Sequence, residues 1–147
     1  MAICTFFGHR NCPESIKSKL RATLINLIIN YDVDTFYVGH QGQFDTIVCD
    51  VLKELKIEYP IIRFYITLAY MPKKESSDAD FSNSLLPNGI ESVHPRYAIV
   101  WRNNWMLRQS DYVVTYITHS WGGAAQFAKK AQAQKKTIFK LGSIFVN

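Results

Sequence analysis

Short apolar runs alternate with amphipathic stretches along most of this chain, and this alternation most constrains the fold. Apolar runs bounded by glycine or proline are typical of buried strands, whereas apolar residues at helical spacing are typical of helices. Strands that are apolar throughout must be covered on both faces, as in a parallel sheet. The sequence therefore predicts an α/β fold: a Rossmann-like three-layer sandwich with a mostly parallel sheet of about five strands. The strands are expected at residues 2–7, 35–38, 61–69, 112–117 and 137–141, and the helices at 13–28, 44–55, 97–109 and 123–136.

The size and composition of the chain fit a single domain over residues 1–147. The 147 residues are 48% hydrophobic and 20% charged, which is the balance of a folded protein rather than a disordered one. No apolar run approaches the roughly 20 residues of a membrane span, and the first residues lack the basic region of a secretory signal. Three cysteines are too few, and odd in number, for a disulfide framework. We therefore expect a cytoplasmic protein.

One long segment, at about residues 70–95, departs from the alternation. It contains Pro72, Pro87, Gly89 and Pro95 together with a patch rich in serine and aspartate. These residues favour a loop, and a loop of this length in a compact domain is usually functional or mobile. The sequence leaves open whether the loop closes over a ligand.

Three polar segments follow predicted strands, so a parallel sheet brings them to the same edge. They are Gly8-His9-Arg10, the turn at 39–45 and the segment 118–124. Ligands of open parallel sheets bind outside the carboxyl ends of the strands. Two of the segments run directly into helices, whose first N–H groups are unpaired and attract phosphate, and glycine permits its close approach. The sequence predicts a phosphate-bearing small ligand here; the alternative is that the glycines only form tight turns.

The candidate ligand-binding residues lie on these three segments and on the helix expected at 97–109. They are Gly8, His9, Arg10, Gly39, His40, Gly42, Phe44, Asp45, Arg102, Asn103, Ser120, Trp121, Gly122, Gly123 and Ala124. Arginine binds phosphate or carboxylate with a fork of donors, and histidine can donate, accept or stack. Asp45 is the one catalytic candidate. Its alternative roles are to accept a hydrogen bond from a ribose hydroxyl or to interact favourably with the dipole at the N-terminus of its own helix. Trp121 is either a stacking platform or a packing residue, and Arg102 and Asn103 either reach the ligand or brace the strands.

A zinc site is the alternative chemistry for this region. His9, Cys12, His40 and Cys49 would supply imidazole and thiolate ligands. The paired Cys-x-x-Cys spacing of structural zinc sites is missing, and Cys49 stands where a small buried residue is ordinary. We therefore predict no metal and no other cofactor.

In their order and spacing these segments resemble the SLOG superfamily, the Rossmann-like domains shared by DNA-uptake proteins of the Smf/DprA type and Lonely Guy phosphoribohydrolases. Within it, the chain looks most like the small bacterial YpsA-like proteins. The similarity covers nearly the whole chain and rests on Gly8-His9-Arg10, residues 39–45, Arg102-Asn103-x-x-Met106, Ser110-Asp111 and Gly122-Gly123. The resemblance implies a nucleotide-derived ligand whose phosphate lies on the glycine pair and whose other end lies on the 39–45 turn. It also implies a homodimer or a higher homo-oligomer.

Two departures from the family patterns bear on the chemistry. YpsA-like proteins usually follow the glycine pair with threonine, whereas Ala124 offers only its backbone here. The Lonely Guy motif carries a further glycine and a glutamate that acts in N-glycosidic cleavage, and residues 120–127 contain neither. Cleavage of that bond develops positive charge that a carboxylate stabilises. Asp45 or Glu91 would have to substitute for the missing glutamate.

Three functions remain open at this stage. The leading expectation is binding, for sensing or sequestration, of a nucleotide-derived small molecule such as ADP-ribose, cyclic ADP-ribose or a nucleoside monophosphate. The alternative is a nucleotide N-glycosidase or phosphoribohydrolase. A third is single-stranded nucleic-acid binding, which the net charge of +5 and the 14% aromatic content permit, although most aromatics fall in predicted strands. No membrane partner is expected. Ala98, Trp101 and Trp105 share one face of a predicted helix, which packs on the sheet or on a second subunit.

Overall fold

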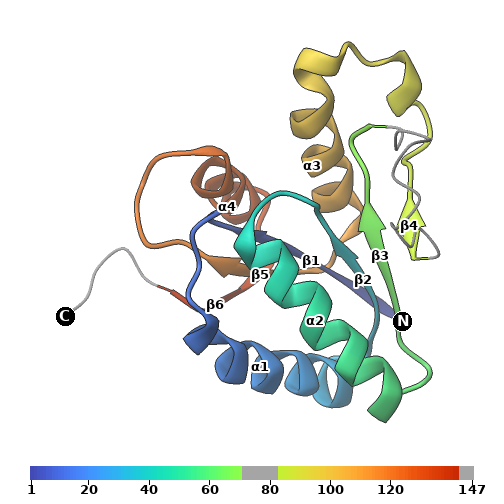
Figure 1. Cartoon of the computed structure of the whole chain (residues 1–147), viewed down its shortest axis with the longest axis vertical. Coiled ribbons are helices and arrows are strands. Elements are labelled where there is room, and N and C mark those ends of the chain that lie inside the picture. Colours follow the sequence, from blue (N-terminus) through green and yellow to red (C-terminus); the bar gives the residue numbers. More distant parts are fainter. Residues whose placement is uncertain (71–82, 143–147) are drawn as a thin grey trace.

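The computed structural model describes residues 1–70 and 83–142, which form one six-stranded sheet with helices around it (Figure 1). The strand order is β4-β3-β2-β1-β5-β6, and every pairing among the described strands is parallel. The elements are β1 (Ala2–Gly8), α1 (Lys17–Asn30), β2 (Val33–Val38), α2 (Gln43–Glu58), β3 (Arg63–Thr67), β4 (Ser84–Leu85), α3 (Ala98–Gln109), β5 (Tyr112–Tyr116), α4 (Gly123–Ala133) and β6 (Thr137–Lys140). The predicted α/β, Rossmann-like class is confirmed. In the described part of the chain, no helix has both the length and the apolar character that crossing a membrane requires.

The helices cover both faces of the sheet because successive side chains of a strand point to opposite sides. On β1, Phe6 packs with Phe36 of β2 in the larger core beneath α1 and α2. Its neighbour Phe7 stacks on Phe127 of α4, with ring centroids 5.3 Å apart, in a smaller core that also includes Met106 of α3. One alternating strand therefore anchors two separate helical layers.

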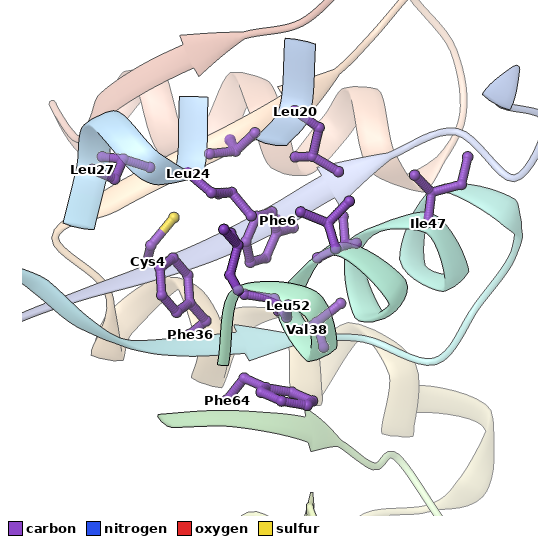
Figure 2. Close-up of a cluster of buried hydrophobic side chains, with 14 of the residues drawn as sticks. Cys4, Phe6, Leu20, Leu24, Leu27, Phe36, Val38, Ile47, Leu52 and Phe64 are labelled. Atoms are coloured by element: carbon purple, nitrogen blue, oxygen red, sulfur yellow. The ribbon is translucent and has the colours of Figure 1, made fainter. Parts of the chain in front are cut away.

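The larger core explains why α1 and α2 form where they do. Their buried leucine, isoleucine and valine side chains recur at helical spacing and meet the apolar face of the sheet (Figure 2). Leu20, Leu24 and Leu27 of α1 are completely buried, and so is Leu52 of α2. Burying each such side chain contributes about 1.5–3 kcal/mol. The apolar stripe that predicted these helices is therefore the stripe that packs.

The strand order creates a crevice at the edge of the sheet. From β1 the chain moves outward through β2 and β3 to β4, and it then returns through α3 to place β5 on the opposite side of β1. The connections that leave β1 and β5 therefore diverge, and this reversal is where open α/β sheets bind ligands. The first polar segment predicted from the sequence lies at this point.

The segment at 70–95, predicted as a loop, contains a short strand and two turns of 3₁₀ helix. Residues 71–82 of this prediction lie outside the described residues. β4 continues the sheet because the edge of β3 offers free backbone groups: Ile66 N–H donates to the Asn83 carbonyl at 2.7 Å, and Leu68 N–H to the Leu85 carbonyl at 2.8 Å. The 3₁₀ turns are Ile90–Ser92 and Pro95–Tyr97. A two-residue strand has no periodicity, so the sequence pattern did not reveal it.

The start of the first helix and the end of the last helix also differ from the prediction. Pro13 and Glu14 were expected in the first turn of a helix, but Pro13 is extended and Glu14–Ile16 forms a 3₁₀ turn that leads into α1. The helix expected to reach residue 136 ends at Ala133, because Lys135 adopts a positive φ of 61° that turns the chain into β6.

Most aromatic side chains in the described part of the chain are buried or half-buried. Trp105 of α3 contacts Tyr37 edge-on, with ring centroids 5.0 Å apart. Trp101 packs with Ala98 and Ile90 in a third apolar cluster. The tryptophan face of α3 therefore packs within the chain. In contrast, Trp121 is 69% exposed.

Candidate functional site

A cavity of about 480 Å³ lies at the carboxyl edge of the sheet, at the crevice between the connections that follow β1 and β5. The turn after β2 and one side of α3 complete its wall. Its lining residues are Phe6, Phe7, Gly8, His9, Arg10, Asn11, Gly39, Gln41, Asp45, Ile99, Arg102, Asn103, Met106, Thr118, His119, Trp121, Gly122, Gly123 and Ala124. Its volume suits a small molecule of the size that ligand pockets usually hold.

Three aromatic rings stack along the β5 side of this cavity. The His9 and His119 rings lie 3.6 Å apart and 16° from parallel, and the His119 and Trp121 rings lie 3.8 Å apart and 22° from parallel. His9 Nε2 accepts hydrogen bonds from the backbone N–H groups of Thr118, at 3.0 Å, and His119, at 3.4 Å. In the neutral ring the proton is therefore on Nδ1. Burial and the neighbouring His119 both lower the pKa of His9, so the neutral ring is favoured.

Arg102 lies on the opposite side of the cavity and is only 2% exposed. Its Nε donates to Asn103 Oδ1 at 2.9 Å, and Nη1 donates to the carbonyl of Thr67 at 3.0 Å. Burial lowers the pKa of Arg102, while the nearby Asp45 carboxylate opposes that effect, and a guanidinium keeps its proton in either case. These two hydrogen bonds use only part of its set of five N–H donors. The remainder can serve a ligand in the cavity.

Asp45 lies in the first turn of α2, close to this guanidinium. Burial raises the pKa of its carboxyl to about 6, although the N–H of Gln41 and the charge of Arg102 both act to lower it. The Gln41 N–H donates to Oδ2 at 2.8 Å. A Cβ added at Gly39 would lie 2.9 Å from the same oxygen, so the backbone approaches the carboxyl closely. Asp45 can accept from a hydroxyl group or exchange a proton near neutral pH.

The N-terminus of α4 is open where it meets the cavity. Gly122 caps the helix with φ 97° and ψ 168°, a backbone conformation that is essentially restricted to glycine. A Cβ added at Gly123 would meet no atom within 4 Å. Within residues 1–70 and 83–142, the backbone N–H groups of Gly123 and Ala124 donate to no carbonyl outside the helix. These N–H groups and the helix dipole together favour an anion.

Most of the predicted site residues line this cavity. They are Gly8, His9, Arg10, Gly39, Asp45, Arg102, Asn103, Trp121, Gly122, Gly123 and Ala124. Contact between these residues and a ligand remains a prediction. The structure brings together residues from both sides of β1, as the topology required.

Four predicted residues lie elsewhere. Phe44 is completely buried beneath α2, where its ring covers Gly8: a Cβ added at Gly8 would lie 2.3 Å from the ring. Gly42 lines a neighbouring groove instead. His40 and Ser120 are exposed and are not part of the cavity wall. Phe44 belongs to the α2 stripe, so its apolar spacing identified a core residue rather than a ligand contact.

Sequence reasoning missed His119. Its Nδ1 is buried and has no hydrogen-bond partner among the described residues, so the ring is held by stacking. A histidine in a glycine-containing segment after a strand was the available signal. Glu91, considered as a substitute carboxylate, is exposed and does not line the cavity.

The zinc hypothesis can be compared with the geometry. Among the described residues, no group of three or more histidine, cysteine, aspartate and glutamate side chains is arranged to hold a metal ion. Cys12 is 4% exposed, and burial raises the pKa of its thiol to about 11, which disfavours the thiolate that zinc requires. His9 directs Nε2 at backbone N–H groups.

No family model and no curated protein matches the chain. The fold is similar to that in the X-ray structure of DNA processing protein A (DprA) from Streptococcus pneumoniae, with a TM-score of 0.65 and 11% sequence identity. The match covers 95% of this chain and 50% of that one, so the chain spans about half the length of that structure. At this identity the likeness concerns the fold alone. The chain therefore has a DprA-like, Rossmann-like fold.

Proposed function

We propose that this protein binds a nucleotide-derived small molecule, in order to sense or sequester it. The observation that carries the proposal is the bare N-terminus of α4, which opens into the same cavity as a buried arginine. The phosphate would lie on the N–H groups of Gly123 and Ala124. Among the described residues, the cavity wall has two arginines, Arg10 and Arg102, and one acid, Asp45, and this balance also favours an anion.

The other end of the ligand would reach the pair formed by Asp45 and Arg102. The carboxyl group accepts hydrogen bonds and the guanidinium donates them, so the pair suits the hydroxyl groups of a sugar. ADP-ribose, cyclic ADP-ribose and nucleoside monophosphates all combine a phosphate with such hydroxyls. No metal or other cofactor is part of this proposal.

The proposal extends to family, assembly and compartment. We place the protein with the YpsA-like branch of the SLOG superfamily and propose that it forms a homodimer. Tyr97 and Val100 at the start of α3 are 58% and 53% exposed and are the surface to test first. Multi-angle light scattering gives the molar mass. All three cysteines are unpaired, which is consistent with the reducing conditions of the cytoplasm.

A thermal-shift and calorimetry panel of AMP, ADP-ribose, cyclic ADP-ribose and NAD tests the proposal. The decisive variants are at Gly123, because this residue lines the cavity at the proposed phosphate site and an added Cβ would meet no atom within 4 Å. Gly123→Glu should weaken binding about tenfold or more relative to Gly123→Gln, since the two side chains differ only in charge. Gly123→Lys should bind at least as tightly as Gly123→Gln.

The stability of the folded protein provides the control, because the charge that weakens ligand binding should stabilise α4, and the charge that favours binding should destabilise it. An acid at the N-terminus of α4 should stabilise the folded protein by about 0.3–1 kcal/mol, and a lysine should destabilise it. If no ligand of the panel binds at millimolar concentration, the proposal is wrong. If binding is unchanged in all three variants, the phosphate is not on α4.

A second candidate is N-glycosidic hydrolysis, which one observation favours: the pKa of Asp45 is raised to about 6 beside a buried arginine. Such a carboxyl could stabilise the positive charge that develops on the sugar. Release of free base from a nucleoside monophosphate, compared between the wild type and Asp45→Asn, is the test. Turnover that is lost in the variant, while ligand binding persists, would favour the enzyme over the binding protein.

A further inference from the structure

Trp121 differs from the other two tryptophans in being exposed to solvent. Even so, stacking on a neighbouring ring holds it in place. It is 69% exposed, whereas Trp101 and Trp105 pack against apolar side chains within the chain. An exposed indole places a large apolar surface in water, so it contributes little to folding. Its position on the cavity wall suggests another use for the ring.

The ring behind Trp121 is fixed. Trp121 stacks on His119 at 3.8 Å, and His119 stacks on His9 at 3.6 Å. Two backbone N–H groups fix the His9 ring through Nε2. His9 is itself only 7% exposed, so the stack is anchored in the protein. A ring that is already ordered loses little conformational entropy when a ligand binds to it.

One face of the indole is covered by His119, and the exposed fraction of the side chain leaves the other face to solvent. We propose that this outer face of Trp121 is a stacking subsite for the aromatic ring of the ligand. The inference rests on the proposed function. The ligand ring would become the fourth in the series that begins at His9.

The position of Trp121 relative to α4 supports this assignment. Trp121 immediately precedes the cap residue Gly122, so adjacent Cα atoms are about 3.8 Å apart. Trp121, Gly123 and Ala124 line the same cavity, so a phosphate on the first N–H groups of α4 and a ring stacked on the indole would share that cavity. In a nucleotide, one sugar separates the phosphate from the base. Both contacts can be made by one ligand.

Stacking predicts a specific kind of selectivity. Every base has a π-face, so a stacking contact tolerates different bases, and the larger purine rings stack more strongly than pyrimidines. The subsite should therefore require an aromatic ring but discriminate weakly among bases.

Calorimetry with AMP and with ribose 5-phosphate, which lacks the ring, tests the subsite. AMP should bind Trp121→Ala about 10- to 100-fold more weakly than it binds the wild type, and Trp121→Phe should recover most of the affinity. Ribose 5-phosphate should bind all three proteins alike. AMP should quench the fluorescence of the wild type and of the control Trp101→Phe, but not that of Trp121→Phe.

The outcomes separate this inference from the function on which it rests. If the wild type binds neither ribose 5-phosphate nor any ligand of the panel, both proposals are wrong; if it binds another ligand of the panel but not AMP, the same comparison with Trp121→Ala is made with that ligand. If AMP binds the wild type and Trp121→Ala equally, only the subsite is wrong. Equal losses of AMP and ribose 5-phosphate would mean that Trp121 only orders the turn before α4, and would also overturn the subsite. A lower molar mass of Trp121→Ala in light scattering, with AMP affinity unchanged, would assign Trp121 to a subunit interface instead.

Discussion

Helices α2 and α4 begin in the same way, yet only one of the two N-termini is free to bind an anion. Each follows a strand of the same sheet, and each is capped by a glycine in nearly the same conformation: φ 99° and ψ −177° at Gly42, and φ 97° and ψ 168° at Gly122. The backbone conformation at the two caps is therefore the same. The difference lies in the hydrogen bonds and packing of the residues around each cap.

At α2 the protein uses the N-terminus itself. The N–H of Gln43 donates to the carbonyl of Arg10 at 2.8 Å, and the side chain of Gln43 accepts from the N–H of Cys12 at 3.1 Å. Phe44 enters the core, and Asp45 accepts from Gln41. At α4 the matching residues are Gly123, Ala124 and Ala125, whose side chains cannot accept a hydrogen bond, and within residues 1–70 and 83–142 the Gly123 N–H donates to no carbonyl outside the helix. A glycine before a helix therefore indicates a turn, and the three residues after it decide whether the turn is closed or open.

Replacing the two cap glycines with alanine should give the largest difference between the turns. Both variants lose the glycine-only conformation, at a cost of about 1–3 kcal/mol each. Gly42→Ala also forces a Cβ to within 2.7 Å of the Arg10 Cα, whereas the nearest atom at Gly122 is 4.0 Å away. We expect Gly42→Ala to lower the free energy of unfolding by about 2–5 kcal/mol and Gly122→Ala by about 1–3. Urea denaturation measures both, and equal losses would mean that the closed turn relaxes.

The same comparison shows how much of the fold and the site the sequence could predict. The apolar stripes predicted the helices and the long strands because burial acts through periodicity, and the topology then brought the polar segments to one edge. Phe44 falls on the apolar stripe of α2, and its burial agrees with that stripe. The place of His119 could not be assigned in this way, because its ring stacks on His9, which lies far away in the sequence. The strand β4 was not predicted, because a strand of two residues is too short to show an apolar periodicity.

The contribution of the α2 turn to the free energy of unfolding should depend on pH, because this turn contains Asp45. The matching residue of α4, Ala125, does not titrate, so the α4 turn should show no such dependence. The folded protein raises the pKa of Asp45 to about 6, above its value near 3.9 in the unfolded chain. The protonated carboxyl therefore stabilises the fold below about pH 4, and this contribution is lost as the pH rises through 6.

Between pH 4 and 7, the wild type should lose about 1–3 kcal/mol of stability relative to Asp45→Asn, which does not titrate. Urea denaturation of both proteins at several pH values in this range measures the difference. The sign is diagnostic: if the wild type instead gained stability relative to the variant, Arg102 would dominate over burial and the pKa would be lowered.

Gln43 tests whether its side chain closes the α2 turn. Gln43→Ala removes the acceptor of the Cys12 N–H and should destabilise the protein by about 1 kcal/mol, because a partly buried donor loses its partner. Gln126→Ala is the matched control on α4, where the side chain is exposed and the change should stay within about 0.5 kcal/mol. Thermal or urea unfolding distinguishes the two. If Gln126→Ala cost as much as Gln43→Ala, the loss would not be specific to the hydrogen bond of the Gln43 side chain.

Gly123→Ala should have the smallest effect and the opposite sign. Gly123 is the first residue of α4, it does not have a positive φ, and an added Cβ meets no atom within 4 Å. Alanine restricts the unfolded chain and favours the helix, so the free energy of unfolding should rise by about 0.4–1 kcal/mol. A protein that places glycine where alanine would be more stable forgoes that stability, and under the proposed function room for a ligand against the backbone would account for the choice. The same variant should therefore bind the nucleotide more weakly while it folds more stably. A gain in stability without any loss of affinity would mean that Gly123 serves the fold alone, and a loss of stability would mean that the open turn of α4 is more crowded than its geometry indicates.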